Sequence, residues 1–180
     1  MHNSTQKKIS TTPEHYGSVT PWIISSSSER LIAFLTSAFN AEEVANSRIV
    51  NEEGMIIHVV VKIGNSLIML FDSREGWGPT PTYLNLYVED VELAHSKAVK
   101  LGAISVTEIT ALWFGEKVCR ILDPFGNLWW INERVEEVDF TDVQEIAKRA
   151  ATQQAIEGIA YIQTSLNVAL LAQKNFVATQ

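Results

Sequence analysis

A chain of 180 residues is long enough for one domain with a sizeable core, and a hydrophobic content of 46% is ordinary for a soluble globular protein. The formal net charge of −7 and the pI near 5.1 argue against a nucleic-acid partner and favour neutral or cationic ligands. A single cysteine, Cys119, excludes an internal disulfide framework, and no apolar run approaches the ~20 residues of a membrane span. We therefore expect a soluble cytoplasmic protein without a membrane partner.

The first half of the chain predicts one strand, one helix and three strands, in that order. Residues 1–15 lack the apolar segment of a signal peptide, and we expect them to form a flexible arm. Ser26 and Glu29 have the spacing of a capping box, which marks the start of an amphipathic helix. The expected elements are a strand at 19–24, a helix at 29–39 and strands at 43–51, 55–63 and 67–71.

The same order of elements recurs after residues 73–82, a loop with two glycines and two prolines. Asp90 and Gly102 carry the start and stop signals of the second helix. Two successive βαβββ modules, at about 18–72 and 82–133, therefore predict an α+β fold built by duplication. The expected elements of the second module are a strand at 83–88, a helix at 91–101, a short strand at 104–107 and a hairpin at 117–132.

The hairpin at 117–132 has the strongest local signals in the chain. Pro124 presets φ for a turn, and Gly126 supplies the positive φ that closes it. Alternation along the returning strand gives it two apolar faces, and we expect both to be covered. The faces are Leu128, Trp130 and Asn132 on one side and Trp129 and Ile131 on the other.

Residues 139–180 differ from the rest of the chain and predict a helical extension. The segment 142–174 is rich in Ala, Gln, Ile and Leu and contains no proline. Its apolar residues keep one face of a helix, which either packs on its own domain or contacts another subunit. These apolar residues are Ile156, Ile159, Ile162, Leu166 and Leu170.

Five segments carry a family resemblance: YGSVTPWII (16–24), IAFLTSAFNAEE (32–43), IHVVVKIGNSLIMLFD (57–72), LNLYVEDVELAHSKAVKLGA (84–103) and RILDPFGNLWWI (120–131). Each is weak alone, but five in register are specific. In order and spacing they resemble the PhnB-like branch of the vicinal oxygen chelate superfamily, also called the glyoxalase/bleomycin-resistance/dioxygenase group. The resemblance covers residues 16–138 and implies a curved mixed sheet, made by the paired modules, that wraps a ligand cavity, often in homodimers.

Enzymes of this superfamily hold a divalent metal on four strand positions with His, Gln or Glu, and the metal polarises an oxygen of the substrate. The resemblance places these positions at Thr20, at Leu70 or Met69 depending on register, at Tyr83 and at Trp130. None of these side chains offers the nitrogen or carboxylate oxygen that such metals select. We therefore expect no metal and no other cofactor.

Alternation places mainly aromatic, uncharged side chains on the face that would line the cavity, which suits stacking on a flat ligand. His58 is the best catalytic candidate, since with Lys62 it could bind an anion or act as a general base, although a structural role is the alternative. Cys119 is either a reactive thiolate or a small buried hydrophobe. The expected ligand-binding residues are Thr20, Trp22, His58, Lys62, Leu70, Tyr83, Asn85, Tyr87, Trp113 and Trp130.

Three functions remain open at this point. The first is a metal-free protein that binds an aromatic or cationic small molecule, like the bleomycin-resistance members of the superfamily. The second is a lyase, isomerase or dioxygenase with a relocated metal or a metal-independent acid–base site. The third is a partner-binding protein that acts through its C-terminal helices. In each case a homodimer is the expected assembly.

Overall fold

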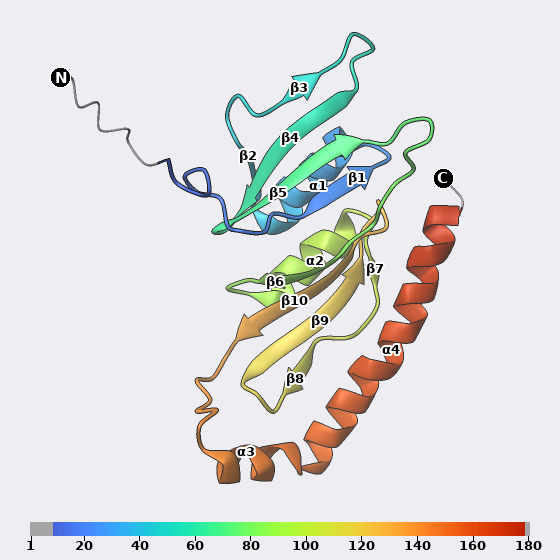
Figure 1. Ribbon diagram of the computed structural model, residues 1–180. Helices are drawn as coiled ribbons and strands as arrows, with labels where there is room; N and C mark the ends of the chain where they lie inside the picture. Colours follow the sequence, from blue (N-terminus) through green and yellow to red (C-terminus); the bar gives the residue numbers. More distant parts are fainter. Residues whose placement is uncertain (1–8, 179–180) are drawn as a thin grey trace, which may run out of the picture.

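The computed structural model describes residues 9–178 and contains two five-stranded sheets, each with one helix against it, followed by two C-terminal helices (Figure 1). Residues 1–8 of the predicted N-terminal arm lie outside the described part. The first sheet, sheet 1, and its helix are formed by β1 (Trp22–Ser25), α1 (Ser28–Phe39), β2 (Glu42–Glu43), β3 (Ile49–Val50), β4 (Ile56–Ile63) and β5 (Ser66–Asp72).

The second sheet, sheet 2, repeats the plan of the first. In sheet 1, β5 pairs in parallel with β1 and antiparallel with β4. In sheet 2, the last strand of the module likewise pairs in parallel with the first strand and antiparallel with the strand before it. The elements are β6 (Tyr83–Tyr87), α2 (Val91–Lys100), β7 (Ile104–Ser105), β8 (Thr110–Leu112), β9 (Glu116–Leu122) and β10 (Leu128–Arg134). The predicted α+β duplication is confirmed.

Local sequence explains where the two module helices begin. The Asp90 side chain accepts a hydrogen bond from the Leu93 amide at 2.8 Å, as the predicted cap should. In α1 the cap is Ser27, which accepts from the Arg30 amide, one position after the predicted Ser26. The capping-box spacing therefore located the helix start to within one residue.

One predicted strand is mostly a loop. Residues 43–51 pair with β4 only at their two ends, through β2 and β3. Between these ends Asn46 has φ +60°, and the Ser47 amide donates to the Val44 carbonyl, so the chain makes a turn there. β-Branched composition predicted an extended segment, but the tertiary structure uses it as a corner.

A single hydrophobic core joins the two modules. It lies between the sheets and the helices α1 and α2, which contact each other. Phe39, at the end of α1, packs against Trp129 of β10 with ring centroids 5.1 Å apart. Trp129 is 1% exposed, so this contact between modules is fully buried.

The β9–β10 turn is held by the buried carboxylate of Asp123. Its oxygens accept hydrogen bonds from the amides of Phe125 and Asn127, from the Asn127 side chain and from the Trp129 indole N–H, at 2.8–2.9 Å. Gly126 has φ +88°, as the turn requires. These contacts set the register that places Arg120 opposite Trp130.

The predicted helical extension forms two helices, α3 (Val143–Ala150) and α4 (Gln153–Ala178). The Thr152 side chain accepts a hydrogen bond from the Ala155 amide, so it caps a new helix and explains the break. Figure 1 shows α4 running the length of sheet 2. Of the predicted apolar stripe, Ile162 is buried and Ile159, Leu166 and Leu170 pack on sheet 2, whereas Ile156 is 53% exposed.

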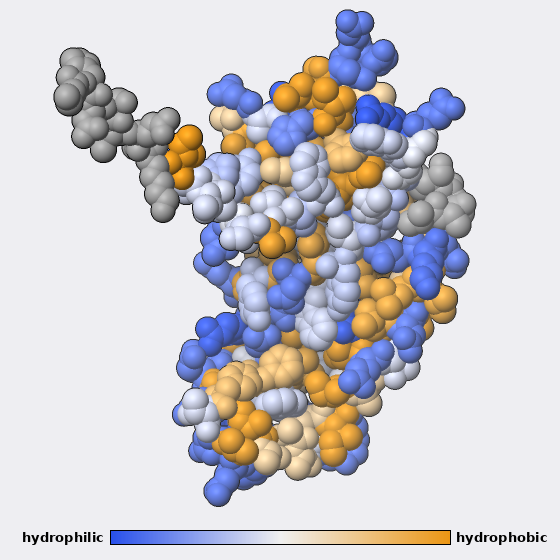
Figure 2. All heavy atoms as spheres, in the orientation of Figure 1, coloured by the Kyte–Doolittle hydropathy of each residue, from blue (hydrophilic) through white to orange (hydrophobic). Residues whose placement is uncertain are grey.

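α4 is also apolar on its outer side. Ile156, Val168 and Leu171 are exposed, and Figure 2 shows hydrophobic residues along this helix. By length and composition alone, Gln153–Phe176 would suffice to cross a membrane, contrary to the expectation that no run approaches that length. A mostly buried helix in the core of a soluble protein meets the same requirement. α4 contacts sheet 2 along one side, and 22% of the apolar window is buried.

Candidate functional site

Most side chains predicted to bind a ligand lie in three places: on the open face of sheet 1, on the face of sheet 2 under α4, and in a groove between the modules. Each sheet has one face toward α1 or α2 and one face away from them. The face away from the helices is the one that would line a cavity in a curved sheet. This face is partly open to solvent in sheet 1 and is covered by α4 in sheet 2.

Sheet 1 leaves an aromatic face partly open to solvent. Trp22 contacts His58 and Phe71, with ring centroids 5.5 Å apart in both pairs. Phe71 in turn contacts Trp77 of the following loop at 5.9 Å. Trp22 and Trp77 are 47% and 49% exposed, so flat surfaces remain available for stacking. The structure therefore brings together Trp22 and His58, as predicted, and adds Phe71 and Trp77.

Two cations border this aromatic face. The Arg74 guanidinium lies over the Trp77 ring at 3.8 Å from its centroid. Lys62 is exposed on β4, four positions beyond His58 and opposite Glu42 of β2. His58 and Lys62 therefore lie on the same strand, and their joint binding of an anion stays a prediction.

Sheet 2 carries a buried cation on the corresponding face. The Arg120 guanidinium lies 4.2 Å from the centroid of the Trp130 ring, and its Nε donates a hydrogen bond to the Tyr83 hydroxyl at 3.2 Å. Arg120 is only 2% exposed. Tyr83 and Trp130, two of the predicted ligand-binding residues, are thus brought together by an arginine that was not predicted.

α4 covers this arginine. Arg120 Nη1 donates to the backbone carbonyl of Ile162, and the Ile162 side chain packs with Leu112 and Val118 of sheet 2. Further along, the Gln173 side chain donates to the carbonyls of Thr82 and Gly126 at 2.9 and 3.0 Å. The predicted cavity half formed by sheet 2 is therefore occupied by the protein's own helix.

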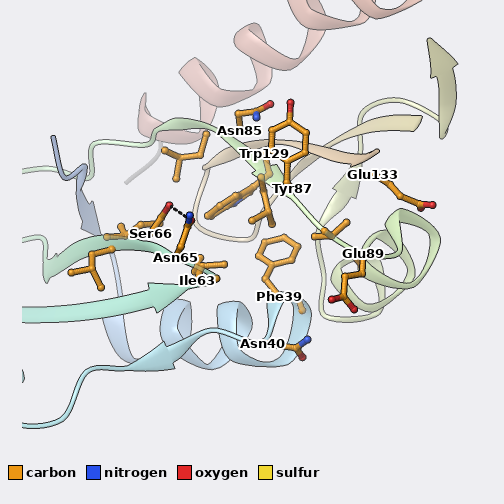
Figure 3. Close-up of a pocket in the computed structure, with 18 of the residues that line it drawn as sticks. Phe39, Asn40, Ile63, Asn65, Ser66, Asn85, Tyr87, Glu89, Trp129 and Glu133 are labelled. Carbon is orange, nitrogen blue, oxygen red and sulfur yellow. Dashed lines mark hydrogen bonds between the residues drawn. The ribbon is translucent and has the colours of Figure 1, made fainter. Parts of the chain in front are cut away.

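A groove of about 1050 Å³ separates the two modules (Figure 3). Thr20, Asn85 and Tyr87 line it, together with Phe39 and Trp129 of the core. In Figure 3, Asn85 and Tyr87 extend from β6 away from Phe39 and Ile63. The groove follows the outer edge of β6, which pairs only with β10 among the described strands.

The polar groups of β6 already have partners within sheet 2. Asn85 Oδ1 accepts a hydrogen bond from Asn132 Nδ2 at 2.8 Å. The Tyr87 hydroxyl donates to the Glu116 carboxylate at 3.1 Å. Burial, followed by this contact, raises the pKa of Tyr87 above its ordinary value, so the phenol stays protonated and is a poor general base at neutral pH.

Two predicted site residues lie elsewhere. Leu70 is completely buried in the core and pairs with Ile23 of β1, because alternation places it on the helix-facing side of β5. Its neighbour Met69 pairs with Trp22 and so belongs to the open face, as the second register predicted. Trp113 contacts Phe114 and Phe140 at the far end of sheet 2, away from the aromatic face of sheet 1.

Arg120 was missed although the sequence contained a signal for it. The Asp123–Asn127 turn sets Leu122 opposite Leu128, and two steps further Arg120 lies opposite Trp130. A charged side chain opposite a tryptophan, between apolar neighbours on the same face, is the pattern of a stacked pair. Its burial could not be predicted, because the covering helix is more than 30 positions later in the chain.

The four positions that bear metal ligands in superfamily enzymes do not suit a metal here. Thr20 lies in the groove, Leu70 in the core, and Tyr83 and Trp130 beside the Arg120 cation. A hydroxyl, an alkyl group, a phenol and an indole provide neither an imidazole nor a carboxylate. A fixed positive charge also opposes a divalent cation at short range. No catalytic step is therefore assigned to a metal at these positions.

One cluster of carboxylates occurs near the groove. The carboxyl oxygens of Asp90, Glu92 and Glu133 lie within 4.8 Å of one another. Asp90 and Glu133 accept hydrogen bonds from the first amides of α2, and Glu92 pairs with Lys117 at 2.8 Å. That ion pair lowers the pKa of Glu92. Helix capping and an ion pair account for the cluster.

Residues 14–131 match the model of the Glyoxalase/Bleomycin resistance protein/Dioxygenase superfamily. Uncharacterised proteins of Mycobacterium bovis and Mycobacterium tuberculosis are 27% identical over 137 residues, which cover 70% of this chain and 89% and 79% of theirs. Among solved structures, TioX from Micromonospora sp. ML1 has a TM-score of 0.54 at 20% identity, and the match covers 66% of this chain and 99% of TioX.

The PhnB protein of Bacillus cereus has a TM-score of 0.53 at 22% identity, covering 65% of this chain and 99% of its own. The fosfomycin resistance protein FosX of Listeria monocytogenes has a TM-score of 0.50 at 16% identity, covering 69% of this chain and 96% of its own. At these identities the structural likenesses, TioX included, establish the fold alone. The match to the family model ends at residue 131, before α3 and α4.

Proposed function

Because the chain belongs to the glyoxalase/bleomycin resistance protein/dioxygenase superfamily, we propose that it is a metal-free protein that binds a small aromatic molecule. The observation that carries the proposal is the partly open aromatic face on which the exposed Trp22 contacts the half-buried His58 and Phe71. The lack of metal-selecting side chains at the four ligand positions supports binding without a metal. The net charge of −7 favours cationic over anionic ligands at long range.

The first experiment is a titration of the protein with naphthalene derivatives that are cationic, neutral or anionic, followed by tryptophan fluorescence. At least one is expected to give a saturable change that EDTA leaves unaltered. Trp22→Ala should raise the dissociation constant by about tenfold, which corresponds to the free energy of one aromatic stacking contact. Trp113→Ala removes a tryptophan remote from the face and is the matched control. The absence of any saturable response would refute the proposal.

An enzymatic role would centre on His58. Its ring lies beside Trp22 on the open face, where a bound ligand would be within reach of an acid or base. Turnover of a bound compound that is lost in His58→Ala, with ligand affinity retained, would support an acid–base enzyme. Equal behaviour of the variant and the wild-type protein would leave binding as the function.

The proposed assembly is a cytoplasmic homodimer. The exposed apolar residues of α4, among them Val168 and Leu171, support a further contact, and a partner protein acting on the C-terminal helices is the alternative. Light scattering of the purified protein should give twice the mass of the 20.1 kDa chain. A monomer at micromolar concentration would contradict the dimer.

A further inference from the structure

We propose that the face of sheet 2 under α4 is a second small-molecule site, that its ligand is an apolar carboxylate, and that α4 is a displaceable cover on it. This inference rests on the proposed function in that both require small-molecule binding, but it concerns a different face and the opposite ligand charge. The argument begins with the charge of Arg120.

Arg120 is a buried cation without an anionic partner in the described chain. Its side chain contacts the Tyr83 hydroxyl, the Trp130 ring and the carbonyl of Ile162, and all three are neutral. No carboxylate of the described residues forms an ion pair with it. Buried charges in proteins are normally paired, because neutral partners compensate only part of the lost hydration.

The groups around Arg120 are mostly hydrogen-bond donors. The Trp130 indole N–H is buried and has no acceptor among the described residues. The Tyr83 hydroxyl accepts from Arg120 and so retains its own proton for donation. A guanidinium, an indole N–H and a phenol O–H on neighbouring positions of one sheet face favour an oxyanion.

α4 supplies a partial substitute for such a ligand. The Ile162 carbonyl accepts from Arg120, and the Ile162 side chain lies between Leu112 and Val118. The helix therefore presents one oxygen next to one apolar group. A ligand that replaced it would have an apolar body and a charged oxygen, and a carboxylate could engage the guanidinium through two parallel hydrogen bonds.

The contacts of α4 are consistent with a cover that can move. Among the described residues of α4, four are buried: Ala155, Gly158, Ile162 and Ala169. Beyond Arg120, polar attachment comes from Gln173, and from Tyr161, whose hydroxyl accepts from the Glu108 amide. Elements with few buried contacts open at low free-energy cost.

The overall acidity does not exclude an anionic ligand. Exposed charges are screened within about 10 Å at ordinary salt, whereas a buried cation acts at contact distance. The net charge of −7 should therefore slow the approach of an anion, and Arg120 should determine what is bound once α4 has moved.

The test compares the binding of 2-naphthoate, 2-naphthamide and 2-naphthylmethylammonium to the full-length protein by calorimetry. Naphthoate is expected to bind at least about tenfold more tightly than naphthamide, the usual gain from a charge-assisted hydrogen bond. Arg120→Gln should abolish this preference. Arg30→Gln is the matched control, because Arg30 also lies over an aromatic ring, that of Phe125, but is exposed on α1 outside both faces, and it should preserve the preference.

A second pair of variants tests the cover on a chain that retains Arg120. Gln173→Ala removes the two hydrogen bonds to Thr82 and Gly126, so α4 should open more often and naphthoate should bind about threefold more tightly. Gln163→Ala changes an exposed glutamine of the same helix and should leave the affinity unchanged. A purely structural α4 would give no gain in either variant.

The outcomes separate the two proposals. Equal affinity for naphthoate and naphthamide, or a preference that survives Arg120→Gln, would overturn the second site while leaving binding on sheet 1 intact. Unchanged affinity in Gln173→Ala would overturn the cover. If none of the three compounds binds, both the proposed function and this inference fail.

Discussion

Two charged side chains lie inside the described part of the fold, and they are compensated differently. Asp123 receives four hydrogen bonds, which oppose the rise in its pKa that burial causes. Arg120 has two neutral hydrogen-bond partners and an aromatic ring. The carboxylate therefore stabilises a turn, whereas the guanidinium retains capacity for an anion.

Cys119 provides a prediction at the same scale. The thiol is completely buried on β9, and burial raises its pKa to about 12 from the ordinary 9.0. Its thiolate fraction at pH 8 should thus be roughly a thousandfold below that of a free cysteine. Iodoacetamide should alkylate the native protein very slowly and the urea-unfolded protein at the normal rate, as measured by mass spectrometry. Fast alkylation of the native state would instead identify a reactive thiolate.

At the scale of elements, α4 is the main difference between the two modules. Sheets 1 and 2 have the same topology, but within residues 9–178 only sheet 2 has a helix on the face away from α1 and α2. The C-terminal end of α4 also touches the β9–β10 turn. A Cβ at Gly126 would lie 2.5 Å from Cδ1 of Phe176.

This contact predicts the effect of Gly126→Ala. The substitution strains a backbone with φ +88° and also displaces Phe176. Gly54→Ala is the control, since Gly54 has φ +82° but no atom within 4 Å of the added methyl group. In urea denaturation, Gly126→Ala should lower the free energy of unfolding by about 1–2 kcal/mol more than Gly54→Ala does. Equal losses would show that α4 does not rest on this turn.

At the scale of the whole molecule, the shared core makes the two modules one unit. Phe39 of the first module packs on Trp129 of the second, and both are buried. The groove between the modules is therefore closed at its base by a hydrophobic contact. Domains joined by a continuous core normally unfold together.

Phe39→Ala tests this unity. The substitution leaves a cavity at the junction and should lower the free energy of unfolding by about 3–5 kcal/mol. Far-UV circular dichroism and tryptophan fluorescence should still report one coincident transition, because both modules lose the same contact. Two separate transitions, or a loss below about 1 kcal/mol, would mean that each module is stable alone.

Much of the fold could be predicted because its signals are local. The Asp90 cap, the Asp123–Asn127 turn and the alternation along β10 each depend on a few neighbouring residues. The misses have tertiary causes. The segment 43–51 turns at Asn46, and only its two ends form backbone pairs with β4. Leu70 faces the core because β5 pairs with β1 in a register that sets Leu70 beside the buried Ile23.

The candidate site was predicted less completely. Trp22 and His58 meet as expected, since alternation within one sheet is readable from the sequence. Trp113 does not join them, because its position depends on where the loop after β8 runs. Lys62 lies on the same strand as His58, and its part in ligand binding stays a prediction. Whether Tyr83 and Trp130 face solvent or a helix could not be read from their own neighbourhood.

The sequence by itself determined the duplicated βαβββ order and the hairpin with its tight turn, since these follow from residue type and short-range spacing. The family resemblance located the four positions that lack metal-selecting side chains. Only the tertiary structure decided that α4 lies on sheet 2 and that Arg120 is buried beneath it. The physical reason is that a helix with apolar residues on two sides can bury them against more than one surface. Which surface it packs on depends on shape complementarity between elements far apart in the chain.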